Sequence, residues 1–451
     1  MVKVMASLAL LMLLPSLGTS IANVALPTLA PAFSASFQQV QWVVLAYLLA
    51  TTTLVVSAGR LGDITGRRRL LLAGILVFTT ASALCGAASS LSMLVAARAA
   101  QGIGAAIMLA LALAFVGEAI SKPRIGRAIG LLGTLSAIGT AIGPSLGGVL
   151  IAGFGWRAIF LINVPLGLLA LGLAWRYLPA DQPAAGTGRM SFDMPGTVLL
   201  ALTLAAYALA MTLGHGKFSV ANLVLLVAAA LGLALFLVVE KRSIAPLVNL
   251  ARLRDPQFSA ALLVSAVVAT VIMATLVVGP FHLSDAMGLA PAQVGFAMSV
   301  GPAVAALVGM PAGRVVDRFG ARRITVIGLA GMACGAAALG MVPIAWGIAG
   351  YLVPSMLLTG SYALFQTANN TGVMKDVPAE QRGVVSGLLN LSRNLGLITG
   401  TAVLGAVFSI GGMHITFTVA AALVGVALVI ALMGRRAAFP QLKPSLKGEQ
   451  R

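Results

Sequence analysis

Gly59-Arg60-Leu61-Gly62-Asp63-Ile64-Thr65-Gly66-Arg67-Arg68-Arg69 occurs a second time as Gly313-Arg314-Val315-Val316-Asp317-Arg318-Phe319-Gly320-Ala321-Arg322-Arg323. Glycine, arginine, aspartate, glycine and the last two arginines match in place. Each copy joins two long apolar stretches. A polar string repeated between membrane-length segments indicates that the two halves of the chain descend from one unit, and it therefore decides the fold.

The composition is that of a protein embedded in a membrane. Hydrophobic residues make up 59% of the 451 residues, charged residues make up 9%, and the mean hydropathy is +1.03. Soluble domains carry roughly 25% charged residues, and a soluble core could not bury this much apolar surface. We therefore expect an all-α integral membrane protein that lies in the lipid bilayer.

The net charge of +18 would suit a nucleic-acid-binding protein, but the placement of the basic residues excludes that function. Only Arg98 and Arg393 lie inside apolar segments, and Arg157 and Lys217 lie in loops expected on the outside. The other lysines and arginines lie in alternate loops and at the two termini. This positive-inside bias predicts a multi-pass protein of the inner (plasma) membrane with both termini in the cytoplasm.

Apolar segments of about 20 residues are long enough to cross a bilayer as helices, and their number predicts the topology. Asp63 and Asp317 are 254 residues apart, which exceeds one six-helix unit by about 65 residues, the length of two more helices. An even insertion leaves both units in the same orientation. The fourteen predicted spans are 4–27, 40–59, 70–89, 92–116, 127–151, 158–178, 195–214, 219–239, 258–281, 293–312, 323–343, 349–372, 386–410 and 414–434.

The domain organisation follows from this count. Two six-helix bundles flank one pair of inserted helices, and a short basic tail ends the chain. The predicted units are residues 1–180 for the N-terminal bundle, 181–250 for the inserted helices and their flanking cytoplasmic loops, 251–436 for the C-terminal bundle, and 437–451 for the tail.

Several motifs resemble those of the major facilitator superfamily, and within it the fourteen-helix drug:proton antiporter branch of multidrug efflux type. The repeated string is similar to the helix 2–3 loop signature of that family. Matches to its helix-4 and helix-5 patterns, and to segments typical of the fourteen-helix branch, follow in order along the chain. They are Leu94, Arg98, Gln101, Gly102 and Gly104; Gly139, Gly143-Pro144 and Gly147-Gly148; and Asn23-Val24-Ala25-Leu26-Pro27, Trp42 with Tyr47, and Gly155-Trp156-Arg157 through Asn163-Val164-Pro165.

The resemblance implies a secondary active exporter of small organic molecules, of the kind that confers antibiotic resistance. Two bundles would rock around a site near the middle of the membrane and expose it to each side in turn, with protons as the coupling ion. The chain contains no phosphate-binding loop pattern, so ATP is not expected to drive transport. We expect no cofactor and no metal, no enzymatic activity, and a monomer.

The repeated loop is the first candidate gating element. An aspartate at the start of a helix favours the helix dipole and can pair with cations. If the pair bridges the two halves in one state only, it is a latch; otherwise the charges merely fix the orientation of the chain in the membrane. The loop residues are Gly59, Asp63, Arg67, Arg68, Asp317 and Arg318.

The fifth span is the second candidate gating element. Small residues at spacing four share one face and let another helix come close, and a proline kinks the helix. The resemblance implies a pliable contact between the two halves, whereas packing alone would also be satisfied by a static, kinked contact. The residues are Gly139, Gly143, Pro144, Gly147 and Gly148.

Polar side chains inside the spans are candidates for the substrate cavity. Arg98 costs several kcal/mol in a membrane unless it is paired or hydrated, so we expect it to face a polar cavity beside Gln101. The alternative is a structural arginine that binds helix-end carbonyls, and for other polar residues it is hydrogen bonding between helices. The remaining candidates are Asn23, Tyr47, Gln366, Asn369, Asn370, Asn390 and Arg393, with Asn394 beside them.

The chain departs from the family at one position that matters for coupling. Many members of the branch have an aspartate five residues before Asn23, and this chain has Gly18 there. No acid lies in the middle of a predicted span, so the candidates for proton binding are Glu118, His282 and Asp285. The last two follow the Gly279-Pro280 pair, which also fits a solvated outer loop.

The same absence bears on the substrate. A cavity with Arg98 and Arg393 but no carboxylate has a positive field, which favours neutral or anionic molecules over dications. A specific metabolite carrier on the same fold remains the alternative function, in either direction and without the usual proton coupling. A membrane-embedded enzyme would require clustered catalytic groups, whereas His215, His282 and His414 lie in separate outer loops.

Overall fold

The structure, a computed structural model, describes residues 2–119, 125–179, 193–213, 219–243, 254–375, 377 and 382–433. Within these ranges every regular element is a helix, and no strand occurs. Lipid imposes this, because each backbone N–H and C=O in the bilayer core must be paired inside the protein. The predicted all-α membrane fold is confirmed.

The first half of the chain contains six long helices and two single turns. The two short helices, α2 and α7, follow the first and the fifth long helix, so both lie at the same end of the bundle. The elements are α1 (Val2–Ala32), α2 (Phe37–Val40), α3 (Trp42–Thr65), α4 (Arg67–Gly86), α5 (Leu91–Ala119), α6 (Ile125–Phe154), α7 (Ala158–Leu161) and α8 (Asn163–Tyr177).

The rest of the chain adds the inserted pair and a second set of long helices. The pair consists of α9 (Met194–Thr212) and α10 (Val220–Arg242). The second half consists of α11 (Pro256–Phe281), the π-helical turn η3 (His282–Ala286), α12 (Pro291–Phe319), α13 (Ala321–Met341), the short helix η4 (Ile344–Trp346), α14 (Gly347–Met374), α15 (Arg382–Thr399), the π-helical turn η6 (Gly400–Leu404) and α16 (Gly405–Met433).

The number of membrane spans agrees with the expectation from the sequence. Thirteen segments of the described chain are long and apolar enough to cross, if Phe37–Val55 and Ser57–Thr65, bent by 56°, count as one span. The last segment, Val385–Met433, has 49 residues, about twice what one crossing of about 30 Å needs. It is broken at Gly412, whose φ of 61° and ψ of −161° are not helical. This segment therefore provides two crossings, which makes fourteen.

The repeated string forms the same turn in both halves. In the first copy Gly66 lies between α3 and α4 with φ 98° and ψ 121°. In the second copy Gly320 lies between α12 and α13 with φ 85° and ψ 138°. A positive φ of this kind is open to glycine at little cost and strains other residues. The glycine shared by the two copies is thus required by the turn that reverses the chain.

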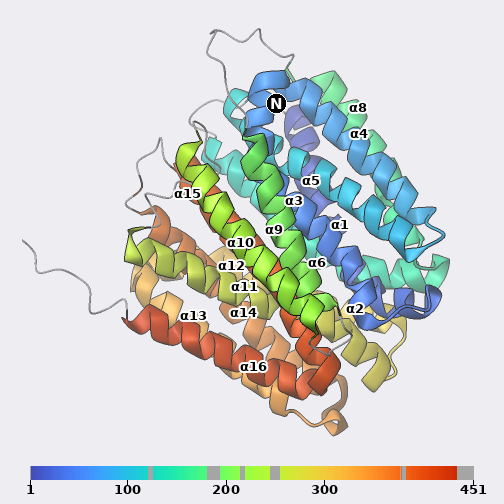
Figure 1. Ribbon diagram of the computed structural model, residues 1–451, viewed down its shortest axis with the longest axis vertical. Helices are drawn as coiled ribbons and strands as arrows, with labels where there is room; N and C mark the ends of the chain where they lie inside the picture. The colour runs from blue at the N-terminus through green and yellow to red at the C-terminus, as the bar shows by residue number, and fades with distance from the viewer. Residues whose placement is uncertain are drawn as a thin grey trace, which may run out of the picture.

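The inserted pair lies across the boundary between the two halves. In Figure 1, α9 and α10 (green to lime) run side by side in front of helices from both halves. Three hydrogen bonds hold α9 there. Thr197 and Ser57 of α3 are joined at 2.9 Å, Trp42 donates to Thr212 at 3.1 Å, and Tyr207 bonds Thr399 of α15 at 3.2 Å.

The two ends of the bundle differ. At the end that carries α2, called here the α2 end, the Phe37 ring lies 4.6 Å from that of Phe281 and 5.1 Å from that of Phe408, both in the second half. The opposite end, called the basic end, carries the N-terminus and the Gly66 and Gly320 turns. Helices of the two halves converge near α2 and diverge toward the basic end (Figure 1).

The contacts between the halves show the same difference. The rings of Phe37, Phe281 and Phe408 meet at the α2 end, and a Cβ on Gly148 would overlap the α12 backbone near that end. Toward the basic end the helices of the two halves diverge (Figure 1). The halves are therefore in contact at the α2 end and further apart at the basic end.

We expect alanine at Gly66 or Gly320 to destabilise the protein, because a residue held at such a φ costs on the order of 1–3 kcal/mol. Gly59→Ala and Gly313→Ala are matched controls in the same strings, since both positions are helical and open. The measurement is the unfolding temperature in detergent. Equal unfolding temperatures for all four variants would contradict the assigned turns.

Candidate functional site

Arg98 of α5 is the most enclosed charged residue of the described chain, with no exposed surface. Its Nε donates to Val43 O of α3 at 2.8 Å, and its Nη1 donates to Gly18 O of α1 at 3.2 Å and to Gln101 Oε1. Its Nη2 has no hydrogen-bond partner among the described residues. The guanidinium thus joins three helices of the first half and keeps one nitrogen free.

Two aromatic rings complete the surroundings of Arg98, and further hydrogen bonds fix its neighbours Tyr47 and Gln101. Its guanidinium carbon lies 4.3 Å from the centre of the Tyr47 ring and 5.9 Å from that of Phe160. Tyr47 donates to Pro15 O at 2.9 Å, and Gln101 donates to Ser82 Oγ at 2.7 Å. The sequence predicted that Arg98 faces a polar cavity, and this proved wrong for the conformation described. Backbone carbonyls and a π face enclose it instead.

Gly18 leaves room for a side chain at the position where the resemblance led us to expect an acid. A Cβ built on it would lie 3.5 Å from Phe78 Cζ and 4.0 Å from the Tyr47 hydroxyl, which are ordinary contacts. Asn23, further along α1, is buried and donates weakly to Thr19 O at 3.4 Å, and its Oδ1 has no described partner. This side of the first half therefore holds a buried cation and unused polar atoms without a described carboxylate.

The polar residues of the second half lie on α14 and α15. Gln366 donates to Asn370 Oδ1 at 3.4 Å, and the buried Asn369 donates to Ala261 O of α11 at 3.4 Å. On α15, Asn390 is exposed and Arg393 is half-buried, with its Nε lacking a partner among the described residues. A polar stripe on a membrane helix requires water or a polar ligand beside it, so this face suits the space between the halves.

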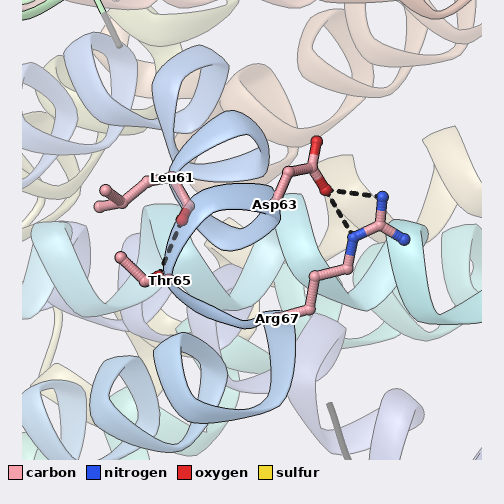
Figure 2. Close-up of polar contacts among 4 residues, drawn as sticks. All are labelled: Leu61, Asp63, Thr65 and Arg67. Carbon is pink, nitrogen blue, oxygen red and sulfur yellow. Dashed lines mark hydrogen bonds and ion pairs between the residues drawn. The ribbon is translucent and has the colours of Figure 1, made fainter. Parts of the chain in front are cut away.

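The repeated loop carries an ion pair in its first copy. Asp63 Oδ1 lies 2.7 Å from both Nε and Nη2 of Arg67, across the Gly66 turn (Figure 2). Arg68 donates to Trp175 O of α8 in the same half. In the second copy Ala321 replaces the paired arginine, and the exposed Asp317 forms no ion pair within the described chain. The observed pair lies within one half and does not bridge the two.

Arg318 and the proton candidates lie near the surface of the bundle. Arg318 is exposed, with its guanidinium 5.4 Å from the centre of the Phe319 ring. Asp285 is exposed, whereas His282 is half-buried with its ring 6.3 Å from that of Tyr351. Both belong to the π-helical turn η3, which continues α11 through Pro280, and the exposure of Asp285 fits the solvated alternative. Glu118 lies in α5, and its side chain is outside the described residues.

The glycines of α6 divide between two neighbours. Gly139, Gly143 and Gly147 face α1 of the same half, where a Cβ would meet Leu13 O, Ser20 and Ile21 respectively. Gly148 faces α12 of the other half, where a Cβ would lie 2.5 Å from Pro291 O and 2.9 Å from Gly295 Cα. The spacing-four face therefore packs α6 onto α1, and Gly148 beside it makes the contact between the halves.

Three contacts between the halves were not predicted from the sequence. Ser145 N in α6 donates to Ser299 Oγ in α12 at 2.8 Å, next to Gly148. The hydrogen bonds of α9 described above are the second. The third is Gln41, which is fully buried against Gly405 of α16 and has neither amide atom bonded to a described residue. Single serines, threonines and a glutamine in apolar segments carry no periodic signal, so the sequence does not mark them.

Valine at Gly148 is expected to separate the halves at the α2 end. Its side chain would overlap the α12 backbone, and overpacking of about 1–3 kcal/mol shifts a two-state population by roughly five- to 150-fold. Spin labels at Ser34 and Ala286, both exposed at the α2 end, would report a longer distance. Gly153→Val is the matched control, because that glycine has open space. The same distance change in both variants, or in neither, would refute the contact.

Comparison with known proteins adds family information to this geometry. The family model described as Major Facilitator Superfamily matches residues 8–401 and 261–450. The multidrug resistance protein Stp of Mycobacterium tuberculosis is 35% identical over 393 residues, covering 86% of this chain and 72% of that protein. The riboflavin transporter RibZ of Clostridioides difficile is 30% identical over 395 residues, covering 87% and 85%. The crystal structure of a D-xylose-proton symporter shares the fold, with a TM-score of 0.71 at 14% identity over 95% of this chain and 96% of that one.

Proposed function

Since this chain belongs to the major facilitator superfamily, we propose that it exports small organic molecules from the cytoplasm by alternating access, as a monomer. The family and fold are those of multi-span membrane transporters and not of enzymes. Multidrug efflux proteins, including Stp, are among its relatives at 29–35% identity. Efflux is therefore the function that the relatives support best.

One observation about the fold carries the proposal. The halves are closed by Phe37, Phe281 and Phe408 at the α2 end, and their helices diverge toward the basic end (Figure 1). This is one of the two conformations that a rocking mechanism needs. If the halves rocked so that the α2 end opened and the basic end closed, the polar face of α14 and α15 would be exposed to the opposite side of the membrane.

The orientation follows from the basic residues. We assign the basic end to the cytoplasm, with both termini on that side, because the arginine-rich turns at Gly66 and Gly320 both lie there. The substrate then enters from the cytoplasm in the conformation described. The proposed units are the two six-helix bundles, 1–180 and 251–436, and the inserted region 181–250 that ties them together.

The charges of the site favour neutral or anionic substrates. Arg393 on α15 is half-buried and supplies one cation, and Arg98, enclosed in the conformation described, would supply a second if a change of conformation exposed its unbonded nitrogen. The described acids Asp63, Asp193, Asp255, Asp285 and Asp317 lie at or beyond helix ends, and Glu240 lies near the end of α10. A positive field without a carboxylate disfavours dications. Asn23, Tyr47, Gln101, Gln366, Asn370 and Asn390 would supply hydrogen bonds, whereas Asn369 faces α11 within the second half.

Protons are the proposed coupling ion, with Glu118, His282 and Asp285 as candidate binding groups. The loop residues Asp63 and Arg67 would act as a latch by exchanging partners when the basic end closes. In the open state their pair stays within one loop, which leaves the halves free to separate. Asp317 has no such pair within the described chain and is the group that a basic residue of the other half could bind on closing.

A specific metabolite is the second candidate substrate class. The name of RibZ, which is 30% identical, states that it transports riboflavin, a single defined compound. A transporter dedicated to one neutral or anionic metabolite would use the same fold and the same polar residues. A substrate panel distinguishes the two candidates, because a dedicated carrier moves one compound and a multidrug exporter moves several.

The decisive experiment is transport by the purified protein in proteoliposomes with an imposed pH gradient. Neutral and anionic compounds are expected to move against their own gradients, and collapse of the pH gradient should abolish that accumulation. Phe37→Asp, which would place a charge in the aromatic closure, serves as a transport-impaired control. Accumulation that persists after the pH gradient is collapsed would end the proton-antiport proposal.

Gly18→Asp is expected to widen the substrate range toward lipophilic cations. A carboxylate there would lie near Tyr47 and Arg98, where the glycine leaves ordinary contact distances. Gly18→Asn is the matched control, with the same shape and no charge. Export of a lipophilic dication should rise about tenfold in the aspartate variant relative to the asparagine variant, equivalent to one ion-pair contribution of about 1.4 kcal/mol. Efficient dication export by the unaltered protein would contradict the charge argument.

A further inference from the structure

A partly open cavity of about 180 Å³ lies in the second half. It is lined by residues of α11, α13, α14 and α16. Its walls are apolar at Val264, Val326 and Ile430, and its polar groups are Gln257, Arg322 and Asn369. The cavity is therefore amphipathic, with a cation near its mouth.

Arg322 is exposed at the mouth of this cavity and makes no hydrogen bond or ion pair with any residue that the structure describes. It is the repeat counterpart of Arg68, which donates to Trp175 O in the first half. Of the described acids, Asp255 accepts from Gln257 N at 2.9 Å and Asp317 is exposed, and neither lines the cavity.

The backbone adds to the positive field. Gln257 is the second residue of α11, and Arg322 is the second residue of α13. The positive end of the α13 dipole therefore adds to the charge of Arg322, whereas the N–H of Gln257 at the start of α11 is capped by Asp255. Asn369, buried at its wall, bonds α14 to Ala261 of α11 and has a second N–H to donate.

The volume decides what kind of ligand fits. About 180 Å³ corresponds to roughly six water molecules at about 30 Å³ each, well below the 300–1,000 Å³ of sites for drug-sized ligands. The cavity is therefore too small for the molecules expected to be exported. We propose that it binds an oxyanion, a carboxylate or phosphate, that carries a short apolar group and is held by Arg322.

Such an oxyanion has two sources, and the experiment separates them. It is either a small organic acid free in solution or the head group of an anionic membrane lipid. Hexanoate and inorganic phosphate represent the first source, titrated onto the purified full-length protein in nanodiscs of phosphatidylcholine alone. Phosphatidylglycerol represents the second, measured as lipid retained by the protein in native mass spectrometry.

Arg322→Gln is the test variant, and Arg323→Gln is its matched control, because the neighbouring arginine has the same charge and does not line the cavity. We expect hexanoate binding or phosphatidylglycerol retention to weaken about tenfold or more in Arg322→Gln and to persist in Arg323→Gln. Ile430→Trp, which fills the cavity and keeps the charge, should weaken it as well.

The outcomes are decisive in both directions. Loss of hexanoate binding confined to Arg322→Gln and Ile430→Trp supports a soluble anion, and the same pattern for phosphatidylglycerol supports a lipid. Equal weakening in both arginine variants, or no binding of any probe, overturns the proposal. Binding is measured without transport, so failure here leaves the proposed export function intact.

Discussion

The backbones of α6 and α12 touch where Gly148 meets Gly295, and the association of the two halves depends on this contact. Side chains larger than hydrogen would hold the helices apart, and lipid supplies no hydrophobic force to push them together. Ser145 and Ser299 add a hydrogen bond beside the glycines. Because the contact lies toward the α2 end, closure there leaves the basic end free to open, and the aromatic group around Phe37 completes the seal.

The inserted helices restrict how the halves can move about the contact between α6 and α12. In two bundles joined only through α6 and α12, the opposite boundary along α3 and α15 would be open to lipid. Here α9 covers it and bonds both sides, through Ser57 and Trp42 on one and Thr399 on the other. Motion of the halves must therefore stretch or exchange these three hydrogen bonds. The length of the apolar segments predicted the two inserted helices. It did not predict that α9 would lie across the boundary between the halves.

The helices and turns, which depend on periodicity and length, were predictable from the sequence. Which neighbouring helix a given residue faces was not. Apolar runs defined fourteen spans, and the repeated string defined two equivalent glycine turns. The proximity of Arg98 and Gln101 followed from their spacing of three on a helix. The enclosure of Arg98 did not, because it depends on carbonyls of α1 and α3 that no pattern marks. Likewise, the glycines of α6 predicted close packing without indicating that three face α1 and one faces α12.

The two halves carry the same repeated string, but its residues make different contacts in each half. The turn glycine is retained in both, while the loop pair of Asp63 and Arg67 has no counterpart in the second half, where Ala321 follows Asp317. The following position of the string is an arginine in both copies, but its contacts differ. Arg68 donates to a backbone carbonyl of the same half, whereas Arg322 borders a cavity. The first half thus encloses Arg98, whereas Arg322 and Asn390 of the second half are exposed.

Gln41 places a polar group inside the closed α2 end. Its amide is fully buried against Gly405, with neither nitrogen nor oxygen bonded to a described residue. A buried amide without a protein partner costs about 1–3 kcal/mol relative to one that is hydrogen-bonded. An apolar side chain at this position would therefore stabilise the closure further, so the glutamine makes the closed end easier to open than an all-apolar seal would be.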